Sequence, residues 1–550
     1  MRIPRTVATV ALAALVPLAC GPAALAAAHD AMPEADAARI RADLAFLADD
    51  LLEGREAGSR GHEIAARYVA ARFEALGLEA AGTEGWFQPV PLRAARLELA
   101  SPELTLLRDG ETRTLRFPTE FVVGASTVRE QSVLEAELVF AGYGLVAGPF
   151  EHDDYAGLDV EGRIVVVLAG APLSWPSEER AHFSREKARL AAARGARGIL
   201  TIPTPVSERV FPFARRSLYL HAPRMDWLEA DGSVHDAQLE LQVGAVLAPE
   251  AVDTLFEGAP RSAAELMEAV EADRIPAGFP LPGRIRLAYA STLEDLSSPN
   301  VIARLPGSDP ARAHEHVVLT AHLDHIGLAR TMDEDRINNG AMDNASGVAT
   351  LLEAARLLRA ARPARSVLFT IVTAEEKGLL GASYFAHHPT VPAEDLIANV
   401  NLDMPMLLFP FADVVAFGAE HSTVADTVAE AAASLGVALA PDPFPEQAIF
   451  VRSDHYRFVQ QGIPAVMLAT GFGSRDPERP GEAAWQRFLA EDYHMPSDEL
   501  DQGIDFDAAA RFAALNARVA LGLADAPERP RWREGDFFGE LYGVRSEAAP

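Results

Sequence analysis

The sequence predicts an α/β fold, in which a mixed sheet is covered by helices on both faces and a smaller α+β module is inserted in the first half of the chain. Hydrophobic residues make up 49% and charged residues 23% of the 550 residues, which is the composition of a globular protein. After about residue 300, strand-like and helix-like segments alternate, as they do in α/β proteins. A separate strand–helix–strand pattern near residues 163–202 predicts the smaller module.

The N-terminus has the pattern of a secretory signal. Arg2 and Arg5 precede an apolar stretch over residues 6–19, and small residues follow as far as Ala28. The apolar stretch is too short for a membrane-spanning helix, and no later segment has 18 unbroken apolar residues. We therefore expect a signal peptide at residues 1–28, an exported protein that is periplasmic or secreted, and no transmembrane helix in the mature chain.

Cys20 is the only cysteine, so the sequence excludes an intramolecular disulfide and a thiolate metal site. Its surroundings resemble a lipoprotein cleavage box, although Pro17 and Leu18 fit that box poorly. Two outcomes stay open: a lipid anchor at Cys20, or cleavage near residues 26–28 that removes it. The formal net charge of −30 disfavours nucleic acid as a partner, because the chain repels phosphate.

Residues 33–130 are predicted to form the N-terminal part of the main domain. Two helices are expected within residues 35–80, the first with Leu44, Leu47, Leu51 and Leu52 on one face and the second at about 61–76. Short β-like runs follow over residues 95–145.

The inserted module is predicted at residues 131–285. It should contain a buried strand at 163–168, a helix at about 184–194 and another strand at 198–202. Four prolines in residues 275–300 suggest a linker. The main domain should then continue over residues 286–530, followed by a C-terminal tail at 531–550. Its expected strands are 317–321, 366–373, 398–402, 413–417 and 465–470, and its expected helices are 345–361 and 378–387.

Acids and histidines stand at the ends of these strands. In open α/β sheets, ligands bind outside the carboxyl ends of the strands, so the fold should bring such residues to one edge. Each one alone has an ordinary explanation; an Asp before a helix, for example, is usually an N-cap. It is their joint occurrence that predicts a site, made of His322, Asp324, Asp343, Glu375, Glu376, Asp403 and His494.

Imidazole and carboxylate ligands without thiolate suit zinc, and also cobalt or manganese. Three carboxylates and two histidines can hold two ions if one carboxylate bridges them, and two ions about 3.5–4 Å apart can stabilise a tetrahedral intermediate. In the pair Glu375–Glu376, one glutamate can bind metal while its neighbour takes a proton from water. His325, His387 and His388 are not expected to be ligands.

Five motifs resemble the co-catalytic zinc aminopeptidase family, whose relatives include aminopeptidase Y, glutamate carboxypeptidase II, glutaminyl cyclases and the transferrin receptor ectodomain. The resemblance implies the zinc-exopeptidase fold, and residues 131–285 look like a protease-associated domain. Residues 52–55 and 61–63 are similar to the family's opening helices. The five motifs are 321–325, 339–347, 373–378, 401–404 and 493–498.

The resemblance implies two Zn²⁺ per chain and a role for each ligand. His322 and Asp403 would hold one zinc, Glu376 and His494 the other, and Asp343 would bridge them with a cis peptide bond after it.

The same resemblance implies three further roles. Glu375 would be the general base. Asp324 would accept a hydrogen bond from His322, and Tyr493 would help to polarise the scissile carbonyl.

The function implied is that of an exported metallo-aminopeptidase acting on peptides with a free N-terminus. One alternative is a carboxypeptidase or dipeptidase of the same fold, which would need a basic cluster for the substrate carboxylate. Another is a non-catalytic, receptor-like binding protein, which is disfavoured because all five ligands are present. The candidate basic residues are Arg330, Arg336, Arg452 and Arg475.

Overall fold

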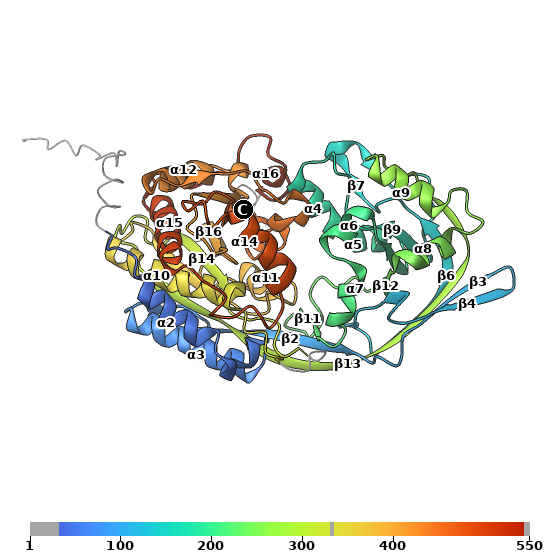
Figure 1. Ribbon diagram of the computed structural model, residues 1–550, viewed down its shortest axis with the longest axis horizontal. Helices are drawn as coiled ribbons and strands as arrows, with labels where there is room; N and C mark the ends of the chain where they lie inside the picture. The colour runs from blue at the N-terminus through green and yellow to red at the C-terminus, as the bar shows by residue number, and fades with distance from the viewer. Residues whose placement is uncertain (1–31, 330–334, 544–550) are drawn as a thin grey trace, which may run out of the picture.

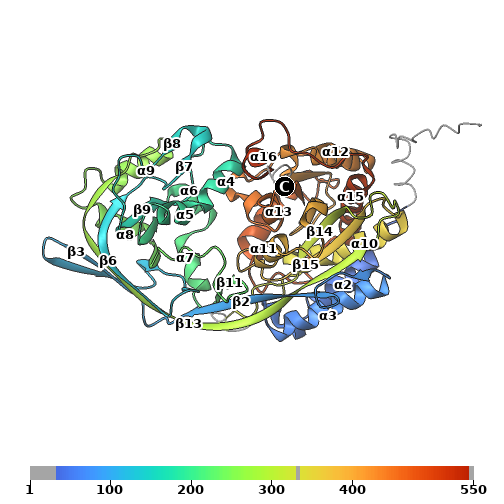
Figure 2. The same ribbon diagram turned by 180° about the vertical axis from the view of Figure 1, so that it is seen from behind.

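The computed structural model describes residues 32–329 and 335–543, and the expected signal peptide at residues 1–28, with Cys20, lies outside these residues. Two lobes lie side by side above a shared curved ribbon of β2 (Phe87–Leu97) and β13 (Phe279–Leu305), as Figures 1 and 2 show from opposite sides. Within the described part of the chain, no helix has the length and apolar character needed to cross a membrane.

The first lobe contains a mixed sheet whose central strands are parallel. β14 pairs in parallel with both β15 and β16, and β16 pairs in parallel with β19. β13 and β17 pair antiparallel at either side of this parallel group. The strands are β1 (Glu79–Ala80), β14 (His316–His322), β15 (Ser366–Val372), β16 (Leu396–Leu402), β17 (Asp413–Phe417), β18 (Ala438–Leu439) and β19 (Ala465–Thr470), with part of β13 and β2 and the edge strand β11 (Arg224–Trp227).

Helices cover both faces of this sheet. Alternate residues of each strand point to opposite faces, so Val317 packs with one layer of helices and Val318 with the other. The fold class expected from the sequence is therefore confirmed. One layer holds α2 (Ala37–Leu47), α3 (Arg60–Ala75), α10 (Ser346–Ala361), α12 (Val424–Ser434) and α15 (Phe506–Asp525), and the other holds α11 (Leu380–His387) and α13 (His455–Val459).

The opening helices follow the expected pattern with one exception. Leu44 and Leu47 are buried on the inner face of α2. The chain then leaves the α-helix for a short 3₁₀ segment, η1 (Asp50–Arg55), and this change of path leaves Leu51 83% exposed. The expectation that Leu51 shares the buried face was wrong, because a 3.6-residue period does not continue through the break.

The second lobe is built around a smaller sheet, with helices packed against it. Strands β3, β4 and β5 pair within this sheet, so residues 103–122 lie with the second lobe. Its strands are β3 (Glu103–Arg108), β4 (Glu111–Leu115), β5 (Phe121–Val122), β6 (Gln131–Phe140), β9 (Ile164–Leu168), β10 (Gly198–Ile202) and β12 (Val243–Leu247); its helices are α4 (Ser177–Arg185), α5 (Lys187–Ala192), α6 (Pro205–Val210), α7 (Phe213–Arg216), α8 (Pro249–Phe256) and α9 (Ala263–Glu271). A separate hairpin joins β7 (Val146–Ala147) and β8 (His152–Asp153).

The linker expected at residues 275–300 is instead most of a 27-residue strand, β13. It pairs with β6 in the second lobe and with β2 and β15 in the first. The register shifts between Leu281 and Arg284, so Pro282 sits in a bulge, where a missing backbone N–H is tolerated. Prolines alone therefore did not indicate a break here.

A buried charge cluster joins the lobes where α4 meets α16 (Phe537–Tyr542) in Figure 1. His421 contacts the carboxylate of Glu178 through Nε2 and that of Asp536 through Nδ1, the latter at 2.5 Å. Burial opposes the imidazolium, but these two hydrogen bonds raise the pKa of His421 to about 10. The cluster therefore connects α4 of the second lobe to two segments of the first.

Replacing Glu178 with Gln is expected to lower the free energy of unfolding by about 2 kcal/mol, because a buried imidazolium loses a charged acceptor. The folded pKa of His421 lies above its usual value of 6.5, so this stabilisation is fully present below pH 6.5, decreases as the pH rises and is lost as the pH passes about 10. Urea unfolding across that pH range measures both effects. The matched control is Glu179→Gln on the same helix; an equal loss in the control, or a loss that persists above pH 10, contradicts the assignment.

Candidate metal centre

The polar cluster lies at the carboxyl edge of the parallel strands. β14 ends at His322, and β15 and β16 end at residues 372 and 402, just before Glu375–Glu376 and Asp403. Asp343 lies in an irregular turn, Ala341–Ala345, that leads into α10, and the bond from Asp343 to Asn344 is cis. Parallel strands end at the same edge, so residues far apart in the sequence meet there.

Asp343 faces a histidine with each of its two carboxylate oxygens. Its Oδ1 lies 3.3 Å from His322 Nε2, which is also 3.1 Å from Asp403 Oδ1. Its Oδ2 lies 3.2 Å from His494 Nε2, which is also 3.2 Å from Glu376 Oε2. The five residues thus form two groups that share Asp343. This is the arrangement needed for a bridging carboxylate between two metal ions.

The charges of the cluster fit divalent cations. Burial opposes ionisation of Asp343, yet hydrogen bonds from His322 and His494 hold its pKa well below the usual value. Burial disfavours an imidazolium at His494, but the charge of Glu376 and hydrogen bonds to both carboxylates raise its pKa to about 10. Several buried carboxylates therefore face two imidazoles. A nitrogen and oxygen donor set of this kind, with surplus negative charge, suits zinc-type ions.

Glu375 lies beside these two groups. Its carboxylate oxygen Oε2 is 4.0 Å from His322 Nε2, and its side chain is 10% exposed. Burial, together with the negative charges of Asp403 and Glu376, raises its pKa well above the usual value of 4.5. Its backbone N–H donates to Asp324 Oδ1 at 3.0 Å, which fixes the segment that follows β15.

The carboxylate of Asp324 does not accept the hydrogen bond expected from His322. The Nδ1 atom of His322 instead contacts the backbone carbonyl of Asp324 at 3.0 Å, whereas the Asp324 carboxylate is 4.0 Å away. That carboxylate accepts the backbone N–H groups of Glu375 and Glu376. Asp324 still orients His322, but through its carbonyl, because its side chain turns toward the end of β15.

His325 joins the cluster, although the sequence did not predict a role for it. It is fully buried, and its Nδ1 lies 2.7 Å from Glu376 Oε1 and 3.9 Å from Asp343 Oδ2. His325 therefore contacts the carboxylate oxygen of Glu376 that His494 does not. Its position three residues after His322, just past the same strand, was the available signal.

Two other residues, neither of them predicted as a ligand, hold members of the cluster in place. Ser453 donates its hydroxyl to Asp403 Oδ2 at 2.6 Å. Asp498 accepts the backbone N–H groups of Met342 at 2.8 Å and Asp343 at 3.0 Å. His455 is buried and makes no hydrogen bond to any of the five predicted ligands within the described chain.

Tyr493 stacks on the ring of His494 at 3.9 Å between centroids, and its hydroxyl accepts a hydrogen bond from Arg452 at 3.1 Å. Burial raises the pKa of Tyr493. The phenol therefore keeps its proton and can donate a hydrogen bond to an oxygen atom bound beside the cluster.

Arg55 lies under the cluster and is 1% exposed. Its guanidinium donates to the carbonyls of Leu323 at 2.9 Å, Asn339 at 2.6 Å and Gly340 at 3.0 Å. Burial lowers its pKa to about 10, which leaves it charged near neutral pH. One buried cation thus ties the segment after β14 to the turn that carries Asp343.

Replacing Arg55 with Met is expected to weaken metal binding about 10- to 100-fold, the usual cost of losing a group that positions ligands. It should also lower the free energy of unfolding by about 3 kcal/mol, because several buried carbonyls lose their donor. Competition with a chelating dye measures the first effect and urea unfolding the second. Arg60→Met, an exposed substitution five residues away, should change neither; unaltered metal affinity in the Arg55 variant would refute the positioning role.

Two cavities meet at the cluster. The smaller has a volume of about 580 Å³, and apolar side chains beside the cluster line one of its walls. The larger, of about 1300 Å³, extends from Glu376 and His494 toward the second lobe. The apolar side chains of the smaller cavity include Met404, Phe417, Met467, Trp485 and Leu489.

The three described arginines that were considered for a basic cluster do not line one common cavity. Arg452 lines the smaller cavity and Arg336 the larger, whereas Arg475 lines neither of these two. Arg330 lies outside the described residues.

Comparison with known proteins gives a consistent result. Residues 300–520 match the model of peptidase family M28. A probable zinc metalloprotease of Pyrenophora tritici-repentis is 26% identical over 265 residues, which cover 42% of this chain and 53% of that protein. Aminopeptidase YwaD of Bacillus subtilis is 28% identical over 193 residues, covering 34% of this chain and 36% of that one. The chain spans about half the length, or less, of these curated relatives.

Among solved structures, an aminopeptidase from Aneurinibacillus sp. strain AM-1 has a similar fold. The TM-score is 0.53 and the sequence identity is 21%. The match covers 91% of this chain and 97% of that chain, so both lobes are included in it.

Proposed function

We propose, from the membership of residues 300–520 in peptidase family M28, that this protein is a two-zinc aminopeptidase that removes the N-terminal residue from peptides. One observation carries the proposal: Asp343 presents one oxygen to the group of His322 and Asp403, and the other to the group of His494 and Glu376. We assign one zinc ion to each group, with Asp343 as the bridging ligand.

Zinc ions bound there would supply Lewis acidity, which polarises the scissile carbonyl and makes water nucleophilic at neutral pH. The chain supplies the remaining groups. Glu375 is the general base, since its buried carboxylate adjoins the cluster without belonging to either group. It accepts a proton from the attacking water and passes it to the leaving amine. Tyr493 is held in place by its hydrogen bond from Arg452 and by its stack on His494. Its hydroxyl donates a hydrogen bond to the oxygen of the scissile carbonyl.

Substrate selection follows from the cavity walls. The apolar side chains of the smaller cavity favour an N-terminal residue with a large apolar side chain such as Leu. Carboxylate oxygens of the centre can accept hydrogen bonds from the free ammonium of that residue. The rest of the bound peptide then extends into the larger cavity.

The decisive experiment compares leucine p-nitroanilide with its N-acetylated form on the purified, zinc-loaded full chain. Rapid turnover of the free amine and none of the blocked substrate is the expected result. Equal turnover of the two would eliminate an aminopeptidase. If only N-blocked peptides with a free carboxylate are hydrolysed, the carboxypeptidase alternative replaces it.

Export, the lipid anchor and the identity of the second lobe are separate proposals. Residues 1–28 would act as a signal peptide, and sequencing the N-terminus of the mature protein tests this; labelled acyl-chain incorporation tests the anchor at Cys20. We assign the second lobe as an inserted protease-associated domain, on the basis of its own sheet and core.

A further inference from the structure

Five arginines line the larger cavity, and two of them, Arg129 and Arg336, donate to backbone carbonyls. The other three have no carboxylate closer than 4.0 Å within residues 32–329 and 335–543. They are Arg96 on β2, Arg216 at the end of α7 and Arg224 on β11. Glu376 and His494 of the candidate metal centre line the same cavity. Metal centre and arginines therefore share one continuous space.

These three arginines make few contacts with carboxylates. In the part of the chain that the structure describes, the Arg96 guanidinium makes one long hydrogen bond, 3.5 Å, to the carbonyl of His221. Arg224 is 61% exposed and lies 4.0 Å from Asp226. Arg216 stacks over Phe211 at 5.2 Å and makes no ion pair within residues 32–329 and 335–543.

The local charge contrasts with that of the whole chain. The sequence has 79 acidic residues against 49 lysines and arginines. Within the described residues, Arg224 is the one of the three that lies near a carboxylate, Asp226, and that carboxylate also accepts the hydroxyl of Thr127 at 2.5 Å. Of the other acids along this cavity, Glu56 pairs with Lys377 at 2.8 Å, Glu376 belongs to the metal centre, and Glu53 and Asp236 are exposed. The cavity lining thus holds six cationic side chains against five acids, and Arg96 and Arg216 have no ion pair with a carboxylate within the described residues.

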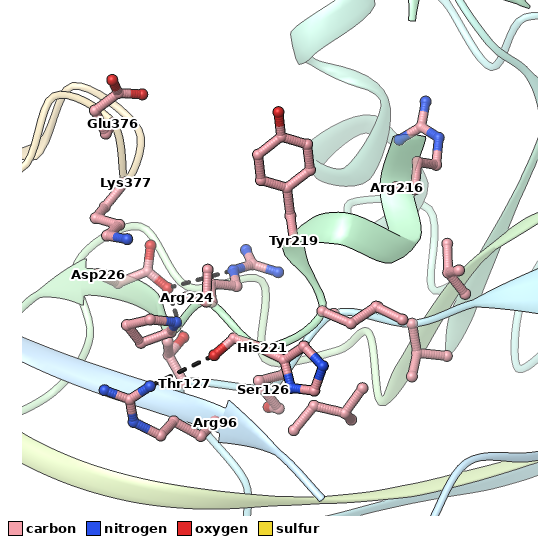
Figure 3. Close-up of a pocket in the computed structure, with 18 of the residues that line it drawn as sticks. Arg96, Ser126, Thr127, Arg216, Tyr219, His221, Arg224, Asp226, Glu376 and Lys377 are labelled. Carbon is pink, nitrogen blue, oxygen red and sulfur yellow. Dashed lines mark hydrogen bonds and ion pairs between the residues drawn. The ribbon is translucent and has the colours of Figure 1, made fainter. Parts of the chain in front are cut away.

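Tyr219 links this wall to the metal centre. Its ring lies 6.2 Å from that of His494. Figure 3 shows its hydroxyl directed into the cavity, between the Glu376–Lys377 segment and Arg216, with Arg96 and Arg224 below. A peptide that extends from the centre past Tyr219 would enter the space that these arginines line.

We propose that Arg96, Arg216 and Arg224 form a carboxylate-binding subsite for the leaving-group side of the substrate. The inference rests on the proposed aminopeptidase function and adds a substrate class: peptides with a negative charge shortly after the scissile bond. Guanidinium groups suit this role because their planar N–H donors match the two oxygens of a carboxylate. The charge can be the C-terminal carboxylate of a short peptide or the side chain of an acidic residue.

Four dipeptide substrates test the proposal on the zinc-loaded full chain: Leu-Gly, Leu-Gly amide, Leu-Asp amide and Leu-Asn amide. The expected kcat/KM for Leu-Gly exceeds that for its amide by about tenfold if the subsite binds the terminal carboxylate. If it binds an acidic side chain, the same preference appears for Leu-Asp amide over Leu-Asn amide. Arg224→Gln and Arg96→Gln should each reduce the observed preference roughly fivefold, the value of one exposed charge pair. Raising the salt from about 0.05 M to about 0.5 M should also reduce it.

The matched control is Arg286→Gln, a half-exposed arginine on β13 that pairs with Glu103 and does not line this cavity. It should keep the preference of the wild type. Hydrolysis of all four substrates without a preference in either pair overturns the subsite and leaves the aminopeptidase proposal standing. If the chain hydrolyses none of the four dipeptides and does not hydrolyse leucine p-nitroanilide, both the subsite and the aminopeptidase proposal are overturned.

Discussion

Replacing Glu375 with Gln is expected to lower kcat by about 10²- to 10⁴-fold while two zinc ions per chain remain bound. General-base catalysis contributes a factor of this size, and Gln has nearly the same shape but cannot accept the proton. Glu375 is suited to the role because its carboxylate lies 4.0 Å from His322 Nε2 and is not part of either group around Asp343. Steady-state kinetics on leucine p-nitroanilide, combined with elemental analysis of bound zinc, measures both quantities.

Glu74→Gln, an exposed change on α3, serves as the control and should behave as the wild type. If Glu375→Gln loses zinc in stoichiometric amounts, Glu375 is a ligand, and the assignment of the pair with Glu376 is reversed. A variant with full zinc and nearly full activity would mean that another group takes the proton.

Replacing Asp343 with Ala is expected to reduce the zinc content below two ions per chain and to lower activity by more than about 100-fold. Loss of a residue that only supports a ligand lowers metal affinity or activity by up to about 100-fold. Asp343 is assigned as a direct ligand to both ions, so its loss should have a larger effect. It is also the only carboxylate that contacts both His322 and His494 within the described residues. Its removal therefore weakens both sites together.

Thermal unfolding gives a second measurement for this variant. A ligand that binds only the folded state stabilises it by about 2.7 kcal/mol at 100 times its Kd, so a chelator should lower the Tm of the wild type. The Tm of Asp343→Ala should respond much less, while Asp253→Ala, an exposed control on α8, should respond like the wild type. Two zinc ions retained by Asp343→Ala would exclude the bridging role.

The local sequence pattern was sufficient to predict many strands and helices of the first lobe. The strands at 366–373, 413–417 and 465–470 and the helix at 345–361 were predicted to within a residue or two of β15, β17, β19 and α10. Runs of apolar residues and helical periodicity specify such elements, because each element must bury its own apolar side chains.

The prediction of secondary structure from the sequence failed for segments whose conformation depends on contacts with distant parts of the chain. β13 contains three prolines within its ordered length, yet it remains a strand because partners on both lobes pair with it and a bulge accommodates Pro282. The expected helix at 184–194 is divided into α4, which starts at residue 177, and α5. Only the assembled sheet and its neighbouring helices decide such outcomes.

For the candidate site, the sequence by itself determined which residue types stand at the strand ends and in what order, because chain direction and strand ends are local properties. It could not determine which atoms meet. Tertiary structure decided that Asp324 orients His322 through its carbonyl, that His325 reaches Glu376, and that Arg55 joins two distant segments. It also decided that Arg96, Arg216 and Arg224 share one cavity with His494. The contacts of His325 and Arg55 depend on how the first lobe folds, and the shared cavity depends on how the two lobes pack. No local pattern encodes either.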